Sequence, residues 1–303
     1  EMALDLKAAE TAMRTHLAEP LDMDLMAAAD GILRIATTAM SYAVKGVTTE
    51  RGLDVGDFAL VAYGGAGPLH ASAVARELGI RKVIIPRAPG VFSAFGMLFS
   101  DLRYDFVRTW FTSLEDAPFD DVERIYLEME SEGRAAIERA SVMPEEVTVK
   151  RAADMRYVGQ EHAVTVDLPI EAFAAQDRDA IKSYFDDMHE LRYGTSAPAE
   201  KAEIVSLRST VTGIMRKPPQ ETVAAGTETP PEEAVTGTRP VFFTEAGGFV
   251  ETPTFARVAL LAGNRLEGPA LVEEHASTTV IMPGDLVEVD RFGNLVIAVG
   301  SRR

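Results

Sequence analysis

The sequence predicts an α/β protein that begins with a βαβ unit, continues with an α+β region and ends in a small β-rich domain. Residues 58–63 and 82–86 are mostly apolar runs bounded by turn residues, which is typical of strands buried on both faces of a sheet. A glycine loop and a helical pattern separate these runs, in the order of a parallel βαβ unit. Beyond residue 147, apolar and polar residues alternate, which predicts β-strands.

Local signals define the first helices. Over residues 25–47, apolar side chains recur every three or four positions, which predicts a helix with one buried stripe that includes Ile32 and Val47. Gly52 follows as a residue that can adopt the left-handed conformation after a helix. A second helix is expected over residues 68–78, because proline suits the first turn of a helix.

Composition divides the chain into four regions. We expect a first domain over residues 1–110 and an α+β region over residues 111–216, with a β-hairpin within residues 154–168. Residues 217–240 contain five prolines and five threonines and almost no large apolar residue, so we expect a linker or exposed loop there. Short apolar runs between turns predict the small β-rich domain over residues 241–303.

Charge and composition exclude several classes of protein. The net charge of −17 repels phosphate backbones, so nucleic acid is not expected as a partner. No apolar run approaches the roughly 20 residues that cross a bilayer, so we expect no membrane span and a cytoplasmic location. The chain contains no cysteine, and its five histidines are never within four residues of one another. We therefore predict no metal site from these residue types.

The glycine loop is the principal candidate for a binding site. Gly64, Gly65, Ala66 and Gly67 stand between a predicted strand and a predicted helix, where backbone N–H groups and the helix dipole favour an anion. A dinucleotide-binding fingerprint needs a further glycine where His70 stands, and the lysine of a P-loop is absent. A tight turn that serves packing alone is an equally weighted interpretation.

Other segments are weaker candidates. His70 lies near the start of the predicted helix, where it is a candidate catalytic or cleft-lining residue, although a capping or packing role is at least as well supported. Residues 89–96 form a second segment bracketed by glycines. Residues 273–275, Glu-Glu-His, offer metal ligands, but neighbouring strand residues point to opposite faces. Arg156 could bind an anion, but pairing with a surface carboxylate is the more common role.

Several strings resemble one protein family in the expected order. They are FALVAYGGAGPLHA at residues 58–71, PGVFSAFG at 89–96, DMRYVGQ at 154–160, and EGPALVEE with STT at 267–279. Together these strings resemble the C-terminal half of the hydantoinase A and 5-oxoprolinase family, which also contains acetone and acetophenone carboxylase subunits.

The resemblance implies an actin-like ATPase domain in which Gly64, Gly65, Ala66 and Gly67 contact the adenosine part of ATP. It also implies a reaction in which ATP phosphorylates a lactam or imide carbonyl, or an enolate, for ring opening or carboxylation. The expected substrate is a small cyclic amide or ketone, and a hydantoinase B-type subunit is the expected partner.

The sequence also departs from the family pattern. The family carries Asp-Gly-Gly-Thr-type loops for the phosphates and Mg²⁺ toward its N-terminus, and no such string occurs in this chain, which starts at Glu1. We therefore expect a C-terminal fragment or split subunit, with the Mg²⁺ ligands on a missing N-terminal half. Without an acidic group to hold Mg²⁺, the isolated chain is expected to be inactive toward ATP.

Two other hypotheses compete with this enzyme. The chain could be a non-catalytic assembly module that retains an ATPase-like fold, which ADP binding would test. It could also be a free-standing dinucleotide-binding domain, a hypothesis that His70 disfavours because it replaces the required glycine.

Overall fold

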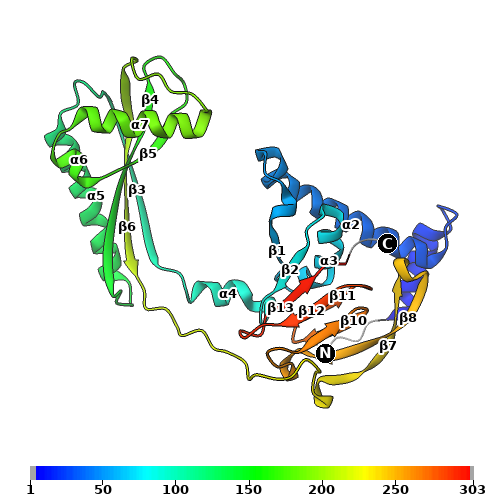
Figure 1. Ribbon diagram of the computed structural model, residues 1–303. Helices are drawn as coiled ribbons and strands as arrows, with labels where there is room; N and C mark the ends of the chain where they lie inside the picture. The colour runs from blue at the N-terminus through cyan, green and yellow to red at the C-terminus, as the bar shows by residue number, and fades with distance from the viewer. Residues whose placement is uncertain (1–4, 301–303) are drawn as a thin grey trace. The chain divides into compact units, whose positions relative to one another are not determined.

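The computed structural model describes residues 5–300 and contains two compact units. Unit 1 comprises the described residues up to 96 and from 219 onward, and unit 2 comprises residues 97–218 (Figure 1). The predicted boundary at residue 110 is therefore too late, because strand β3 (Leu102–Ser113) already belongs to unit 2. Each unit has its own hydrophobic core.

The first sheet of unit 1 contains the predicted βαβ unit. Strand β1 (Ala59–Val61) pairs in parallel with β2 (Lys82–Ile85), and helix α3 (Gly67–Leu78) connects them. The sheet continues through three strands from the end of the chain in the order β1-β2-β13-β12-β9: β13 (Leu295–Ala298), β12 (Leu286–Val289) and β9 (Arg265–Glu267).

The separate C-terminal β domain expected over residues 241–303 is therefore wrong. Strand β13 pairs antiparallel with β2, which places Ile297 opposite Val83 and Leu295 opposite Ile85. All four side chains are fully buried. The physical reason is that β2 is apolar on both faces and needs a second neighbouring strand, which comes from the end of the chain.

The second sheet of unit 1 includes the last residues of the segment that was predicted to be a linker. Its order is β11-β10-β8-β7, with β7 (Val235–Phe243), β8 (Gly248–Ala256), β10 (Ala270–Glu274) and β11 (Ser277–Ile281). Much of the predicted loop at 217–240 is irregular, but its last residues form β7. Because β7 is an edge strand, it can accommodate Pro240 and a row of exposed side chains.

The N-terminal helices have the predicted bounds but a different buried face. Helix α1 (Leu6–Met13) and a π-helical turn precede α2, which spans Leu25–Val47 as predicted. The structure buries Ala28, Thr37 and Ser41 of α2, whereas Ile32 and Val47 are exposed. The expected apolar stripe is thus correct only in part: Met40 packs against the core, but Ile32 and Val47 do not, because small side chains let α2 approach α3 closely.

Unit 2 is an antiparallel sheet with helices packed against it. The strand order is β3-β6-β4-β5, with β4 (Glu146–Tyr157), β5 (Val164–Leu168) and β6 (Ala202–Ile214). The helices are α5 (Phe119–Arg139), α6 (Ile170–Ala174) and α7 (Arg178–Tyr193). The predicted hairpin is confirmed by the antiparallel pairing of β4 and β5. Across residues 5–300, no helix has the length and apolar character needed to span a bilayer.

Candidate functional site

The glycine loop lies where the two parallel strands of unit 1 end. It follows β1, and residues 86–90 follow β2, so both loops are at the carboxyl edge of the sheet, the usual position of ligand sites in α/β proteins. Gly64 has φ +84°, which favours glycine. Its N–H donates a 2.8 Å hydrogen bond to the Pro89 carbonyl, so the two loops are connected.

The loop leaves backbone donors available to a ligand. Gly65 and Ala66 are exposed, and Ala66 caps α3 without a side-chain hydrogen bond. Within the described part of the chain, the N–H groups of Gly65, Ala66 and Gly67 donate no hydrogen bond. Such donors at the start of a 12-residue helix can bind an anionic or polar ligand.

A turn from the second sheet forms another side of the site. A Cβ at Gly65 would lie 3.1 Å from the carbonyl oxygen of Ala276, in the turn between β10 and β11. A Cβ at Gly90 would lie 3.6 Å from the same oxygen. Three backbone segments therefore meet here, and a side chain at Gly65 would crowd them, whereas a Cβ at Gly90 would make an ordinary van der Waals contact. Sequence reasoning missed this turn, because it is distant from the loop along the chain.

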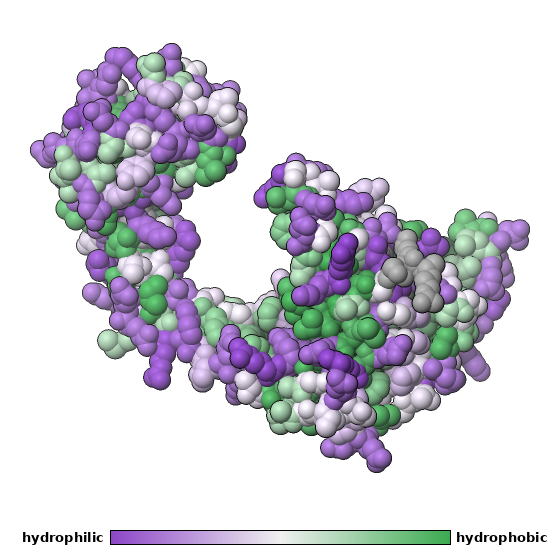
Figure 2. Space-filling view, in the orientation of Figure 1, coloured by the Kyte–Doolittle hydropathy of each residue, from purple (hydrophilic) through white to green (hydrophobic). Residues whose placement is uncertain are grey.

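An exposed aromatic pair flanks the loop. The rings of Tyr63 and Phe92 lie 5.3 Å apart, with Phe92 at the start of the short helix α4 (Phe92–Met97). Half of Tyr63 is exposed to solvent, and Figure 2 shows apolar residues gathered over the region of unit 1 where β1 and β2 lie. Sequence reasoning overlooked this pair, although Tyr63 and Phe92 belong to the two glycine-containing segments.

His70 gains no support as a catalytic residue. It is partly exposed on α3, and within residues 5–300 it has no hydrogen bond, ion pair or ring contact. The structure therefore brings no carboxylate to its imidazole.

The three side chains of the Glu-Glu-His segment do not converge on one point, as the strand pattern predicts. Glu273 lies 3.5 Å from Arg239, while the Glu274 side chain is largely buried and His275 is exposed. Among the described residues, no group of three acidic or histidine side chains could hold a metal ion.

Two buried side chains stand beside the loops. Arg257, only 7% exposed, donates from Nη2 to the carbonyls of Ile85 (3.2 Å) and Gly293 (2.6 Å). Burial lowers the pKa of Arg257 to about 10, and the negative charge of Glu274 opposes this change. Burial raises the pKa of Glu274, whereas Arg257 and a hydrogen bond from the Ala88 N–H act in the opposite direction.

The Arg156 segment has a structural role in unit 2. Arg156 forms a 2.6 Å ion pair with Glu203, so its guanidinium is already paired and the anion-site hypothesis loses its basis. Asp154, two residues earlier, accepts hydrogen bonds from Ser206, from Arg208 Nε at 2.8 Å and from Thr165 at 2.6 Å. These contacts join β4 to both of its neighbours in the sheet.

Asp154 predicts an acid-dependent loss of stability in unit 2. Burial raises the pKa of its carboxyl, but hydrogen bonds from Arg208, Ser206 and Thr165 outweigh burial and hold it below the ordinary 3.8. Ionised Asp154 therefore stabilises the fold above that value, and this contribution disappears as the pH falls through the lowered pKa. Asp154→Asn should cost about 1–3 kcal/mol at neutral pH, and less as the pH approaches 2.

Urea unfolding between pH 7 and pH 2, followed by the fluorescence of the single tryptophan, Trp110 of unit 2, measures this difference. Asp167→Asn is the control, since Asp167 is exposed on β5 and has no side-chain hydrogen bond or ion pair among residues 5–300. A constant difference between wild type and Asp154→Asn across this pH range would contradict the prediction.

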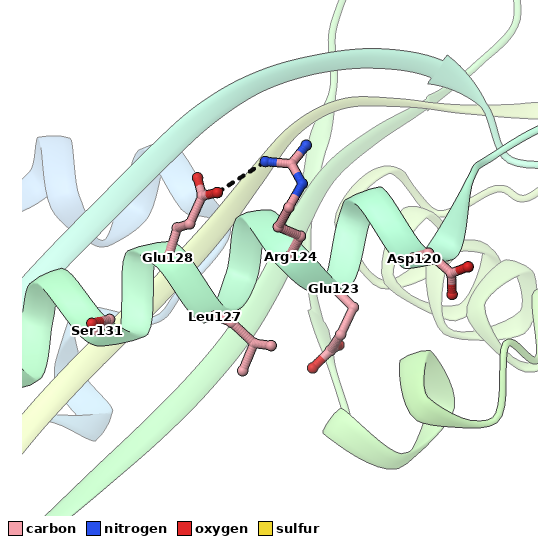
Figure 3. Close-up of a pocket in the computed structure, with 6 residues that line it drawn as sticks. All are labelled: Asp120, Glu123, Arg124, Leu127, Glu128 and Ser131. Carbon is pink, nitrogen blue, oxygen red and sulfur yellow. Dashed lines mark hydrogen bonds and ion pairs between the residues drawn. The ribbon is translucent and has the colours of Figure 1, made fainter.

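A shallow hollow on α5 is unrelated to the glycine loop. Its lining side chains all project from one exposed helix face (Figure 3): Asp120, Glu123, Arg124, Leu127, Glu128 and Ser131. Arg124 and Glu128 form a 2.9 Å ion pair across it. A single helix face with an internal ion pair supplies no converging groups for a reaction.

The structure is a mixed α/β fold with several sheets, and an open glycine loop lies at the carboxyl edge of a parallel strand pair. Residues 1–106 match the family model described as hydantoinase/oxoprolinase, and residues 115–296 match its C-terminal domain. The chain belongs to the hydantoinase/oxoprolinase family, and the resemblance found in the sequence is confirmed.

Individual relatives agree with this assignment. The chain is 35% identical over 93% of its length to an uncharacterized protein of Methanocaldococcus jannaschii. It is 29% identical over 95% of its length to caprolactamase subunit alpha of Pseudomonas jessenii. The crystal structure of the ATP-dependent caprolactamase from that organism matches 98% of the chain with a TM-score of 0.73 and 26% identity, and 43% of the caprolactamase chain is covered.

A nucleotide-free structure of acetone carboxylase has the same fold, with a TM-score of 0.79 at 23% identity over 98% of this chain and 43% of that one. The chain spans about two fifths of its relatives: 39% of the Methanocaldococcus protein and 42% of caprolactamase subunit alpha.

Proposed function

We propose that the chain is the C-terminal portion of an ATP-dependent hydantoinase/oxoprolinase-type subunit with an actin-like ATPase domain. In this proposal Gly64, Gly65, Ala66 and Gly67 contact the adenosine part of ATP. The observation that carries it is the open turn at the carboxyl edge of β1 and β2, whose N–H groups have no acceptor within the described residues.

The proposed reaction activates an unreactive carbonyl compound. The oxygen of a lactam or imide carbonyl, or of an enolate, attacks the γ-phosphorus of ATP; the bond to the β-phosphate oxygen breaks, and ADP leaves. For ring opening, water adds to the phosphorylated carbonyl carbon, the ring C–N bond breaks as the nitrogen takes a proton, and hydrolysis of the resulting acyl phosphate releases phosphate. For carboxylation, the enol phosphate transfers its phosphoryl group to water while its carbon forms a bond to CO2, and the C–O bond is retained as the ketone. Relatives described as an ATP-dependent caprolactamase and an acetone carboxylase subunit support these two outcomes.

The chain supplies only part of such a site. Mg²⁺ would neutralise phosphate charge, but among residues 5–300 no three acidic or histidine side chains come together as a metal-binding group, so the residues present do not form a Mg²⁺ site of that kind. The proposal therefore places the Mg²⁺ ligands on an N-terminal half or split subunit, and adds a hydantoinase B-type subunit as partner. It places the assembly in the cytoplasm, where ATP is available, and retains His70 as a candidate cleft residue.

A non-catalytic assembly module is the second candidate function. Its supporting observation is that His70, a candidate acid or base near the loop, has no hydrogen bond or ion pair among residues 5–300. The two functions differ in a single property, because only the enzyme requires the glycine loop to contribute affinity for a nucleotide.

Calorimetric titration of ADP separates the two candidates. The 303-residue chain alone is expected to bind ADP weakly and to lack ATPase activity. The same chain combined with the N-terminal polypeptide is expected to bind ADP at micromolar concentration. Absence of ADP binding by the combined protein would favour the assembly module, and ATP turnover by the isolated chain would contradict the proposed division of the site. Binding of NAD without ADP binding would restore the dinucleotide hypothesis.

A further inference from the structure

Strand β1 is an edge strand without the charged residues or proline that often protect an edge. Within residues 5–300 it pairs with β2 alone, and the order β1-β2-β13-β12-β9 leaves its other side open (Figure 1). Unpaired backbone groups at an edge attract other strands, so natural edges usually carry charges or proline. Residues 58–63, FALVAY, contain neither. The sequence of β1 is therefore typical of an interior strand.

The opposite edge of the same sheet is protected in the usual way. Strand β9 exposes Arg265 and Glu267 and buries Leu266. The Arg265 N–H donates a 2.7 Å hydrogen bond to the Glu228 carbonyl, and the Arg265 side chain forms an ion pair with Glu228. The outer side of β9 thus has charged side chains and a backbone partner, and the outer side of β1 differs from it in its apolar side chains.

The free side of β1 also presents backbone donors. The Ala62 N–H donates a 3.0 Å hydrogen bond to the Ile84 carbonyl of β2. Successive residues of a strand direct their backbone groups to opposite sides, so the N–H groups of Val61 and Tyr63 point away from β2. The Tyr63 N–H donates to no backbone acceptor among residues 5–300. A further strand at this side would find donors ready to pair.

The sheet face that carries Val61 is only partly covered. Val61 lies beside Ile84 of β2, and Ile84 lies beside Val296 of β13. Their neighbours Val83 and Ile85 point to the other face, into the core that α3 covers. Val61 is 47% exposed, and Ile84 and Val296 are half-buried. Because parallel strands are normally covered on both faces, this side of the sheet also fits further polypeptide.

We propose that a β-strand from the rest of the subunit adds to the free edge of β1 and makes β1 an interior strand. The relatives have the necessary length, since this chain spans 42% of caprolactamase subunit alpha and more than half of that subunit lies outside the match. The added strand is apolar on both faces, as buried strands of parallel sheets are. Its origin in the N-terminal polypeptide rests on the proposed function; the open edge of β1 does not.

Val61→Lys tests the edge in the combined protein. Lysine suits an exposed edge, so the isolated variant chain should keep the thermal stability of the wild type. A lysine covered by an added strand is unfavourable, so association with the N-terminal polypeptide should weaken by about tenfold or more. Val235→Lys is the matched control, because Val235 is 50% exposed on β7, the edge of the second sheet. Sedimentation velocity measures the association, and equal association of the two variants would overturn the inference.

Hydrogen–deuterium exchange at single amides tests strand addition in the wild type. The amides of Val61 and Tyr63 are expected to exchange about tenfold or more slowly in the combined protein than in the isolated chain. The Ala62 amide should change less, because it is already bonded to Ile84. Unchanged exchange at Val61 and Tyr63 would contradict strand addition. A dimer of the isolated chain that Val61→Lys dissociates would show that a second copy pairs with β1, and would also overturn the proposal.

Both measurements are made without nucleotide, so they are independent of the proposed function. If the combined protein assembles and protects the Val61 amide but binds no ADP, the proposed function fails and the strand addition stands. If the two polypeptides do not associate, the strand addition fails, whatever nucleotide the chain binds.

Discussion

Replacing Gly65 by aspartate is expected to weaken ADP binding by the combined protein by about a hundredfold. A Cβ at this position would lie 3.1 Å from the Ala276 carbonyl, which must move to accommodate it. The new carboxylate can also accept the unbonded N–H of Gly67, two residues further on, as asparagine and aspartate side chains do in turns. The substitution would therefore occupy a donor that the proposed function assigns to the nucleotide.

The same geometry predicts little loss of stability for Gly65→Asp, since the hydrogen bond from the Gly67 N–H offsets the crowding. Calorimetry of ADP binding and thermal unfolding should be measured together. Gly194→Asp is the control: it adds the same charge in unit 2, at the left-handed position after α7, where no atom lies within 4 Å of an added Cβ. Equal ADP affinity of the two variants would remove the glycine loop from the nucleotide site.

Asp285→Ala is expected to destabilise unit 1 by about 3–5 kcal/mol. The Asp285 side chain is fully buried and forms a 2.6 Å ion pair with Arg76 of α3, which is itself 5% exposed. Asp285 also accepts hydrogen bonds from the N–H groups of Met282 and Gly300. Removal of the carboxylate leaves a buried guanidinium without its close partner, because Glu245 is 4.0 Å away.

Far-UV circular dichroism in urea measures the loss, while the fluorescence of Trp110 reports on unit 2. The circular dichroism transition should move to lower urea and the fluorescence transition should stay in place. Glu288→Ala is the matched control on β12, because its ion pair with Arg265 is exposed and long at 3.5 Å, so a change within about 0.5 kcal/mol is expected. Similar transitions for both variants would show that the buried pair is unimportant.

Local signals were sufficient to predict the elements near the site. Helix α2 begins where Asp24 caps the N–H groups of Met26 and Ala27, and such capping residues are visible in the sequence. The order of strand, glycine loop, helix and strand likewise predicted the turn at Gly64, because its determinants are adjacent along the chain.

Partners distant in sequence could not be predicted in the same way. The continuous apolar run of β13 indicates a buried strand, but nothing local specifies that β2 is its neighbour. The same limitation hid the close approach of the Ala276 carbonyl to Gly65. The buried face of α2 was missed in part because helix periodicity favours large apolar residues, whereas the small side chains of Ala28 and Ser41 are buried there.

The position of β13 between β2 and β12 determines the order in which the molecule can form on the ribosome. Unit 2 is continuous in sequence and can acquire its core as soon as it has emerged. The sheet that carries the glycine loop is incomplete until residues 295–298 have been translated, so β2 keeps an unpaired edge until then. Loss of residues 295–298 would leave the glycine loop attached to the β1–β2 strand pair without the neighbouring strand β13.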